Sequence, residues 1–178
     1  MPQCLRSKWQ VFTQKLRRAE NKKPYMTKRR KARELALQFL YEEDGDISNL
    51  DYKINRFYND FAVESLKRDG FIKTKEDLNK KKDTAEIFDF FSSIVKGTLI
   101  NLKKIDEVIK NISKNWSIER MSRVDRNLLR LSIYEIIFAP ETPKNVVINE
   151  AVEIAKKFGN DESPAFINGI LDAAIKVK

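Results

Sequence analysis

The sequence predicts an all-α protein of about seven helices, and three observations support this prediction. Apolar residues recur at the i, i+3, i+4 spacing of one helix face in one segment after another. Glycines, prolines and capping residues stand between these segments. No segment shows the strict alternation of apolar and polar residues that is typical of a half-buried strand. With 178 residues, 42% of them hydrophobic, the chain can bury a core as one globular domain.

The first strongly patterned helix begins near Lys28, and Gly45 ends it. Its apolar face consists of Ala32, Leu35, Ala36, Phe39 and Leu40. A second apolar stripe predicts a helix from Leu50 to about Gly70. The lysine-rich stretch over 71–82 is typical of a loop.

A long helical region is predicted over 83–112, where Asp83 and Glu86 form a capping box at its start. The region is either broken or tightly packed at Gly97. Ser122 and Asp125 form a second capping box before a helix that is apolar around nearly its whole circumference. Such a helix is expected to be central and buried.

Two further helices complete the predicted fold. Pro140 and Pro143 mark a turn, after which a helix over 147–158 is closed by Gly159. Ser163 and Pro164 supply an N-cap and a first-turn proline for the last helix.

The composition argues against catalysis and against metal binding. The chain has no histidine, which is the commonest general base and the commonest metal ligand. Its single cysteine, Cys4, cannot form an internal disulfide or a multi-cysteine metal site. Phosphate-binding, nucleophile-elbow and zinc motifs are missing. We therefore expect a protein that is not an enzyme and has no cofactor.

The distribution of apolar residues along the sequence predicts a cytoplasmic protein without a membrane partner. No apolar run approaches the roughly 20 residues that cross a bilayer. The charged start and apolar core of a secretory signal are also missing.

The positive charge is concentrated at the start of the chain. Residues 1–33 hold 12 lysines and arginines and one acid, Glu20, whereas 34–178 hold 23 basic and 25 acidic residues. The net charge of +9 therefore comes from the N-terminal segment. A basic segment joined to a slightly acidic globule indicates a polyanion partner that is met at one place.

We expect this chain to divide into a basic extension, residues 1–25, and one helical RNA-binding domain, residues 26–178. The extension carries a weak apolar stripe of Trp9, Val11, Phe12 and Leu16, which Pro24 interrupts. It is expected to be a flexible tail or a loose helix, and Met26 is the expected start of the domain.

The strongest candidate site is the basic turn at the start of the first core helix, Lys28, Arg29, Arg30, Lys31 and Arg33. Cations at a helix N-terminus oppose the helix dipole and repel one another. A bound phosphate would satisfy both the side chains and the free N–H groups, which favours RNA binding. The alternatives are a solvated basic turn and a membrane-binding helix; against the latter, the apolar stripe of this helix is needed for a core.

Three blocks of sequence stand in a familiar order and spacing: RRKARELALQFLYEED, NWSIERMSRVDRNLLRLSIYEI and NVVINEAVEIAKKFGNDESPAFINGILD. With a weaker match around IVKGTLINLKKIDEVI, they resemble the NusB family of transcription antitermination factors. The resemblance covers roughly residues 28–175 and implies a fold of two small packed helical bundles.

The resemblance also implies a function. Proteins of this family support processive transcription antitermination, especially of ribosomal RNA operons, as part of the transcription elongation complex. They pair with NusE, a small-subunit ribosomal protein, and the pair binds the single-stranded boxA element of nascent RNA.

By position, the basic turn matches the family's arginine-rich RNA-binding turn, with two lysines in place of arginines. Glu162 and Phe166 match positions near the family's RNA surface. Phe166 could stack on a base, or it could belong to a core stripe with Ile170 and Ala174.

Tyr41 and Asp125 match family positions at the NusE contact. Asp125 could equally serve the capping box with Ser122, and Tyr41 could be half-buried packing at the end of its helix.

Two other classes of function compete with antitermination. NusB-like domains also occur fused to RNA cytosine methyltransferases, but this chain has no glycine-rich motif or room for such a catalytic half. A protein-interaction module whose charge serves only solubility is the other alternative.

Overall fold

The computed structural model describes residues 27–43, 47–79, 82–113 and 117–176. Within these ranges every regular element is a helix, which confirms the predicted all-α class. The expected basic extension, residues 1–25, lies outside the described residues.

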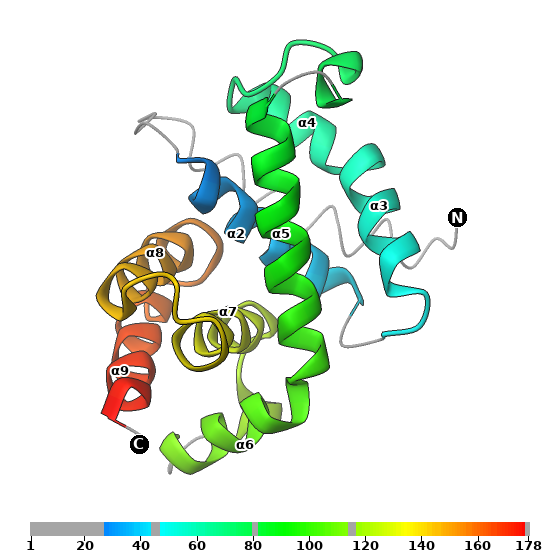
Figure 1. Cartoon of the computed structure of the whole chain (residues 1–178). Helices are drawn as coiled ribbons and strands as arrows, with labels where there is room; N and C mark the ends of the chain where they lie inside the picture. Colours follow the sequence, from blue (N-terminus) through cyan, green and yellow to red (C-terminus); the bar gives the residue numbers. More distant parts are fainter. Residues whose placement is uncertain (1–26, 44–46, 80–81, 114–116, 177–178) are drawn as a thin grey trace.

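The structure contains α-helices of very different length, joined by short turns (Figure 1). Their bounds are α2 (Lys28–Glu43), α3 (Leu50–Asp60), α4 (Ala62–Arg68), α5 (Lys82–Ile100), α6 (Leu102–Ile112), α7 (Arg123–Ile133), α8 (Lys144–Phe158) and α9 (Ser163–Lys176). Two short 3-10 helices, η2 (Lys75–Asn79) and η3 (Ile118–Arg120), and one π-helix, η4 (Tyr134–Phe138), lie between them.

The helices enclose two hydrophobic clusters, which confirms the expected pair of packed bundles. One cluster lies among α2, α3, α4 and α5, and the other lies mainly among α6, α7, α8 and α9 (Figure 1). Helix α2 belongs to both, because Leu35 and Phe39 enter the first cluster while Leu37 enters the second. Burying such a side chain stabilises a fold by about 1.5 to 3 kcal/mol, so α2 joins the two bundles through its packing.

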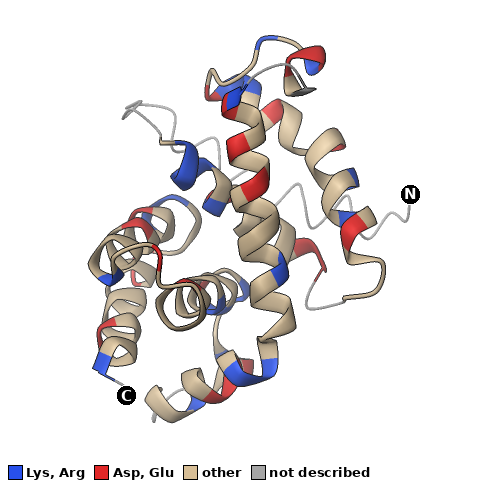
Figure 2. Ribbon diagram, in the orientation of Figure 1, with Lys and Arg blue, Asp and Glu red and all other residues tan. Residues whose placement is uncertain are grey.

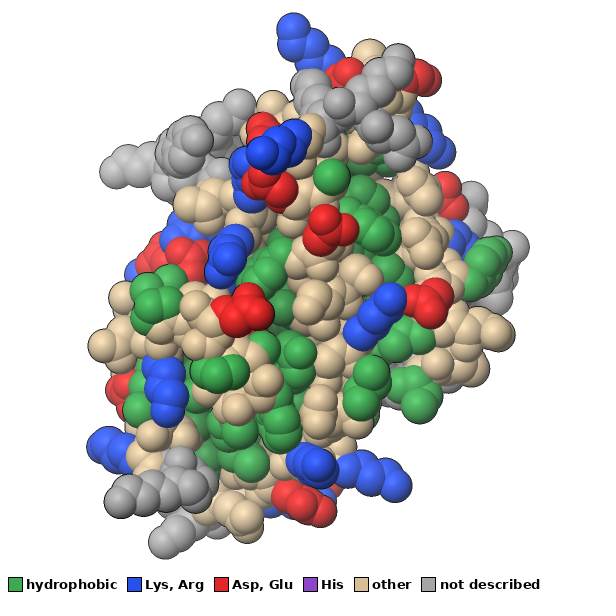
Figure 3. Space-filling view, viewed as in Figure 1, with side chains coloured by type: hydrophobic (Ala, Val, Ile, Leu, Met, Phe, Trp, Pro, Cys, Tyr) green, Lys and Arg blue, Asp and Glu red, His purple; other side chains and the backbone are tan. Residues whose placement is uncertain are grey.

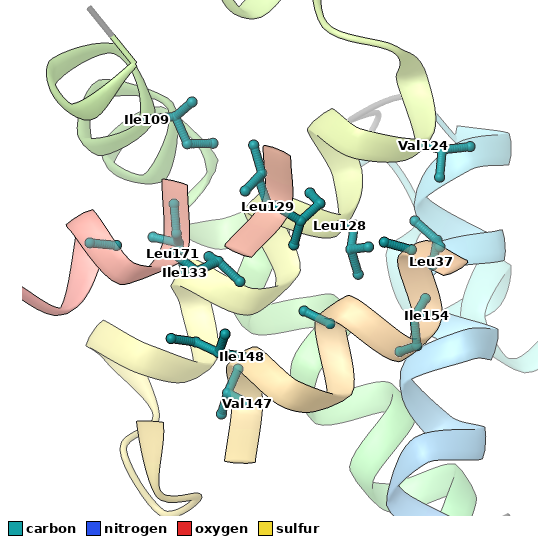
Figure 4. Packing of buried hydrophobic residues seen from close by; sticks show 14 of the residues in the cluster. Leu37, Ile109, Val124, Leu128, Leu129, Ile133, Val147, Ile148, Ile154 and Leu171 are labelled. Carbon is teal, nitrogen blue, oxygen red and sulfur yellow. The ribbon is translucent and has the colours of Figure 1, made fainter. Parts of the chain in front are cut away.

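Helix α7 occupies the centre of the second bundle, as its sequence predicted. It packs against α2, α6, α8 and α9. Figure 4 shows Leu128, Leu129 and Ile133 of α7 among side chains of α6, α8 and α9. Even its polar residue Asn127 is buried, and its amide donates to the carbonyl oxygen of Leu40 at 3.2 Å.

The long helical region over 83–112 is interrupted at Asn101, between α5 and α6, and not at Gly97. Gly97 is instead a point of close packing, the other alternative that the sequence left open. A Cβ atom added there would lie 1.9 Å from the ring of Tyr134. Tyr134 begins the π-helix η4, in which the amide of Ala139 donates to the carbonyl of Tyr134 at 3.1 Å. Gly97 therefore allows η4 to approach α5.

Two other predicted boundaries differ from the structure. The single helix expected from Leu50 to about Gly70 is divided at Phe61 into α3 and α4. The stretch predicted as a loop contains the short helix η2.

The capping box at Ser122 forms in a modified way. The Ser122 hydroxyl accepts from the amide of Asp125 at 3.0 Å, as expected, but it also donates to the Asp125 carboxylate at 2.7 Å. The predicted box at Asp83 is wrong, because α5 begins at Lys82 and both Asp83 and Glu86 bind Lys28 instead.

The cap of α9 is Asn160, and the prediction of Ser163 as the sole cap is corrected. The Asn160 side-chain oxygen accepts from the amides of Glu162 and Ser163 at 3.1 and 2.8 Å. The Ser163 hydroxyl accepts from the Asn160 amide at 3.0 Å, so the two residues cap each other reciprocally.

We expect Gly97→Ala to lower the free energy of unfolding by about 1 to 3 kcal/mol, because the new methyl group would displace the Tyr134 ring. Urea or thermal unfolding measures this change. Gly169→Ala is the matched control, since nothing lies within 4 Å of a Cβ atom at Gly169. That control is expected to be neutral or stabilising by up to about 1 kcal/mol, because alanine favours a helix. Equal effects of the two substitutions would contradict the packing role.

Candidate nucleic-acid interface

The basic turn opens α2, but its five cations do not share one surface. Successive side chains on a helix point about a quarter-turn apart, so one turn faces both solvent and core. Arg29 is exposed, Lys28 and Arg30 are partly exposed, and Lys31 and Arg33 are buried.

Lys31 fastens α2 to the end of α4. Its ammonium group donates to the hydroxyl and the carbonyl of Ser65, at 2.6 and 3.0 Å, and forms an ion pair with Asp69. The side chain is fully buried, and this burial lowers the pKa of Lys31 from its ordinary value. Lys31 therefore acts within the fold.

Arg33 forms a buried bidentate ion pair with Glu135 of η4. Its Nε and Nη2 atoms donate to the two carboxylate oxygens at 2.8 and 2.6 Å. The two side chains are 4% and 3% exposed, so neither is accessible to a partner molecule. This ion pair links α2 to η4, the segment after α7.

The next residue, Glu34, joins α2 to α8. Lys157 donates to its carboxylate at 2.7 Å. Burial raises the pKa of Glu34, and the charge of Lys157 opposes that shift.

The two partly exposed cations also meet carboxylates. Lys28 lies 2.6 Å from both Asp83 and Glu86 of α5, and these hydrogen bonds raise the pKa of Lys28 to about 12. Arg30 makes a bidentate pair with Glu150 of α8, at 2.7 and 2.8 Å. These hydrogen bonds raise the pKa of Arg30 above its ordinary value.

Arg29 differs from the other four cations, because it forms no ion pair with any residue in the described part of the chain. Its Nη1 donates to the hydroxyl of Thr142 at 3.2 Å. Its guanidinium carbon lies 5.1 Å from the centroid of the Phe90 ring, within the range of a cation–π interaction.

Of the five cations expected to contact RNA, Lys28, Arg29 and Arg30 are at least partly exposed, whereas Lys31 and Arg33 are buried. Four of the five cations form ion pairs with carboxylates from other parts of the fold. These carboxylates belong to Asp69, Asp83, Glu86, Glu135 and Glu150. Figure 2 shows the basic start of α2 beside acidic segments of α5. Figure 3 shows basic and acidic side chains intermingled on this face of the molecule. The conflict with the helix dipole is relieved within the fold, without a bound phosphate.

An open groove of about 480 Å³ lies beside these cations. Its lining includes Lys28 and Arg29 of α2, Thr142 and Pro143 just before α8, Val146 in the first turn of α8, and two acids, Glu86 and Glu150. Val146 is 44% exposed, so the groove combines cations, carboxylates and an apolar surface. Nucleotides offer both phosphate and base, which suits such a mixed lining.

The second predicted RNA patch lies at the start of α9. Glu162 is exposed in the turn that Asn160 caps. Phe166 is half-buried and packs against the second hydrophobic cluster. Its contact with the cluster fits the core reading, and base stacking through its exposed part stays a prediction.

The residues expected at the NusE contact lie at the junction of α2 and α7. The Arg123 guanidinium covers the Tyr41 ring at 5.3 Å and donates to the Tyr41 carbonyl at 3.4 Å. Asp125 is only 6% exposed, and its Oδ1 atom is buried with no hydrogen-bond partner among the described residues. An unpaired buried carboxylate oxygen is costly, so a donor that reached it after a local movement would find a strong acceptor.

Sequence reasoning missed Phe90, Thr142, Glu150 and Arg123 as parts of these sites. No local pattern connects these residues to the basic turn, because they lie far from it along the chain.

Comparison with known proteins decides the family. The NusB family model matches residues 30–176. The transcription antitermination protein NusB of Geotalea uraniireducens is 46% identical over 147 residues, covering 83% of this chain and 93% of that protein. The relative of the same name from Thermodesulfovibrio yellowstonii is 41% identical over 149 residues, covering 84% and 92%.

This chain belongs to the NusB family. Its structural neighbours agree with the assignment. The T. maritima NusB structure matches with a TM-score of 0.59 and 30% identity, covering 87% of this chain and 92% of that one. A structure of the antitermination factors NusB and NusE in complex with double-stranded RNA matches with a TM-score of 0.60 and 26% identity, covering 84% and 96%.

In the part of the chain that the structure describes, no helix is long and apolar enough to cross a membrane. The same residues contain no cluster of three acidic, cysteine or histidine side chains that could hold a metal ion.

We expect Arg33→Ala to lower the free energy of unfolding by about 3 to 5 kcal/mol, because it would leave the Glu135 carboxylate buried without its partner. The melting temperature should fall accordingly, whereas Arg29→Ala should leave it nearly unchanged. A double variant, Arg33→Met with Glu135→Leu, should recover most of the loss. An unchanged melting temperature for Arg33→Ala would contradict the structural role of this pair.

Proposed function

We propose that this protein acts in transcription antitermination by binding single-stranded boxA-like RNA together with NusE, in support of ribosomal RNA operons. We place it in the cytoplasm, in contact with the transcription elongation complex, and assign it no catalytic activity. The observation that carries the proposal is Arg29, an exposed cation that pairs with no carboxylate among the described residues, at the groove of a NusB-family fold.

In this proposal, Lys28, Arg29 and Arg30 contact phosphates directly. Lys31 and Arg33 contribute by fixing α2 and not by touching RNA, since their side chains are buried in ion pairs. Because carboxylates already hold Lys28 and Arg30, a phosphate must compete with them, and the electrostatic gain per contact is correspondingly smaller.

Helix α8 connects the two parts of the proposed RNA path. Its first turn lines the groove, its Glu150 holds Arg30, and its C-terminal end leads to the turn that carries Glu162. A strand of RNA that follows α8 would therefore meet the basic turn first and Phe166 afterwards. Base stacking on Phe166 would add about 1 to 3 kcal/mol.

Tyr41 and Asp125 form the proposed contact with NusE. The unpaired Oδ1 atom of Asp125 is buried, so NusE binding would include a local movement that exposes it to a donor on the partner. Arg123 holds the Tyr41 ring in place beside it.

Double-stranded RNA is a second candidate ligand. It is favoured by one observation, namely that a similar NusB–NusE structure contains double-stranded RNA. A basic turn at a helix start can contact phosphates of either form, so binding to single strands and duplexes must be compared directly.

The RNA proposal predicts a log–log salt slope of about −2.1, because three phosphate contacts to a single strand contribute about −0.7 each. Fluorescence anisotropy with a single-stranded boxA-like oligonucleotide at graded salt measures it. Substituting Lys28, Arg29 and Arg30 together by alanine should reduce affinity at least tenfold and flatten the slope. Substituting Lys103, Lys104 and Lys110 together by alanine, three exposed lysines on α6, is the charge-matched control.

Two outcomes would contradict this assignment. A flat salt slope with no preference for boxA-like sequence would favour a protein-interaction module. Tighter binding of a duplex of the same sequence would favour double-stranded RNA.

The NusE proposal predicts that Asp125→Asn weakens NusE binding at least tenfold while RNA binding without NusE is unchanged. Loss of a charge-assisted hydrogen bond costs about 1.5 to 3 kcal/mol. Isothermal calorimetry with purified NusE measures the effect. Ser122→Ala is the control, because it removes the α7 cap and leaves the carboxylate, so it should lower the melting temperature without weakening NusE binding by tenfold. Normal NusE affinity for Asp125→Asn would place the contact elsewhere.

A further inference from the structure

We propose that Phe90 and Thr142 are positioning residues that hold the Arg29 guanidinium ready for an RNA phosphate. This inference rests on the proposed RNA-binding function and adds two residues to the site. Neither residue belongs to the basic turn, and each comes from a different element: Phe90 lies on α5 and Thr142 lies just before α8.

Two contacts fix Arg29 from two directions. The Phe90 ring lies under the guanidinium at 5.1 Å, and the Thr142 hydroxyl accepts from Nη1 at 3.2 Å. Thr142 is only 7% exposed, so its hydroxyl is held in place by the fold. A free arginine side chain has many rotamers, and a side chain that is already ordered loses less freedom when it binds.

Both partners of Arg29 are uncharged, and this distinguishes it from the other cations of the turn. A carboxylate would orient an arginine but would also neutralise it and occupy its donors. An aromatic face and a hydroxyl orient the group without forming an ion pair with it. Thr142 uses one of the five guanidinium N–H groups, so the others remain available for a bidentate bond to phosphate.

Phe90 itself is tied to the buried ion pair of α2. Its ring also lies 5.1 Å from the guanidinium carbon of Arg33, which Glu135 holds through two hydrogen bonds. A continuous set of contacts therefore runs from the buried pair through the ring to Arg29 at the surface. Arg33 supports the RNA site by this route, although RNA cannot reach it.

The sequence places two phenylalanines side by side on α5, and the structure gives them different tasks. Phe91 is fully buried in the first hydrophobic cluster, whereas Phe90 is half-buried at its edge. A residue needed only for packing would not require an aromatic ring at the edge, where the ring faces arginines.

A double-mutant cycle tests the inference with the full-length protein and a single-stranded boxA-like RNA oligonucleotide. Ordering a free arginine side chain on binding lowers affinity by about two- to tenfold, so Phe90→Leu, which releases Arg29 in part, should weaken RNA binding by about two- to fivefold. Arg29→Ala should weaken it about tenfold. In the Arg29→Ala background, Phe90→Leu should have no further effect, because the ring acts only through Arg29.

Three further variants separate positioning from packing. Phe90→Trp should retain the wild-type affinity, because tryptophan offers the strongest cation–π face. Thr142→Val should weaken binding about twofold, again only when Arg29 is present. Phe88→Leu is the matched control, since Phe88 is a half-buried phenylalanine on the same helix whose ring contacts Tyr58 and Phe91. It should leave RNA affinity unchanged.

The outcomes distinguish this inference from the function on which it rests. If the wild-type protein does not bind RNA, the proposed function fails. If Arg29→Ala weakens binding but Phe90→Leu does not, only the positioning role fails. An equal loss from Phe90→Leu with and without Arg29 would also overturn it, because it would show a general structural effect.

Discussion

The ion pair between Arg33 and Glu135 lies at the point where the two helical bundles meet, and neither side chain reaches solvent. Two charges removed from water are tolerated only when their geometry is good and their hydrogen bonds are satisfied. The bidentate contact meets both conditions. It specifies how α2 is rotated against η4 and hence which residues of the basic turn face outward.

The position of α2 is further determined by contacts with α4, α5 and α8. Lys31 binds Asp69 at the end of α4, Lys28 binds α5, and Arg30 binds Glu150 of α8. The turn therefore serves both the fold and the proposed RNA contact. Such a site offers less non-specific attraction than five free cations, because the carboxylates reduce the long-range field around it. The proposed RNA contact therefore depends more strongly on one oriented arginine, Arg29.

Several elements could be predicted from the sequence because their causes are local. Three features follow from residues within a few turns of one another. They are the apolar face of α2, the apolar residues all around α7 and the N-cap at Ser122. Gly97 shows the limit of this reasoning. Its presence in a helical pattern indicated either a break or close packing, and only the approach of the Tyr134 ring distinguishes the two. The Asp83 cap was wrong for the same reason, since its carboxylate finds a partner on another helix.

The sequence by itself determined the all-α class, the approximate helices, the concentration of charge before residue 34 and the resemblance to the NusB family. It could not determine which cations of the basic turn are available. Their partners lie 38 to 120 positions away along the chain, on α4, α5, η4 and α8. Charge is a property of each residue, whereas exposure and pairing depend on which distant elements pack against it. Tertiary structure alone therefore left Arg29 as the one cation of the basic turn that has no carboxylate partner among the described residues.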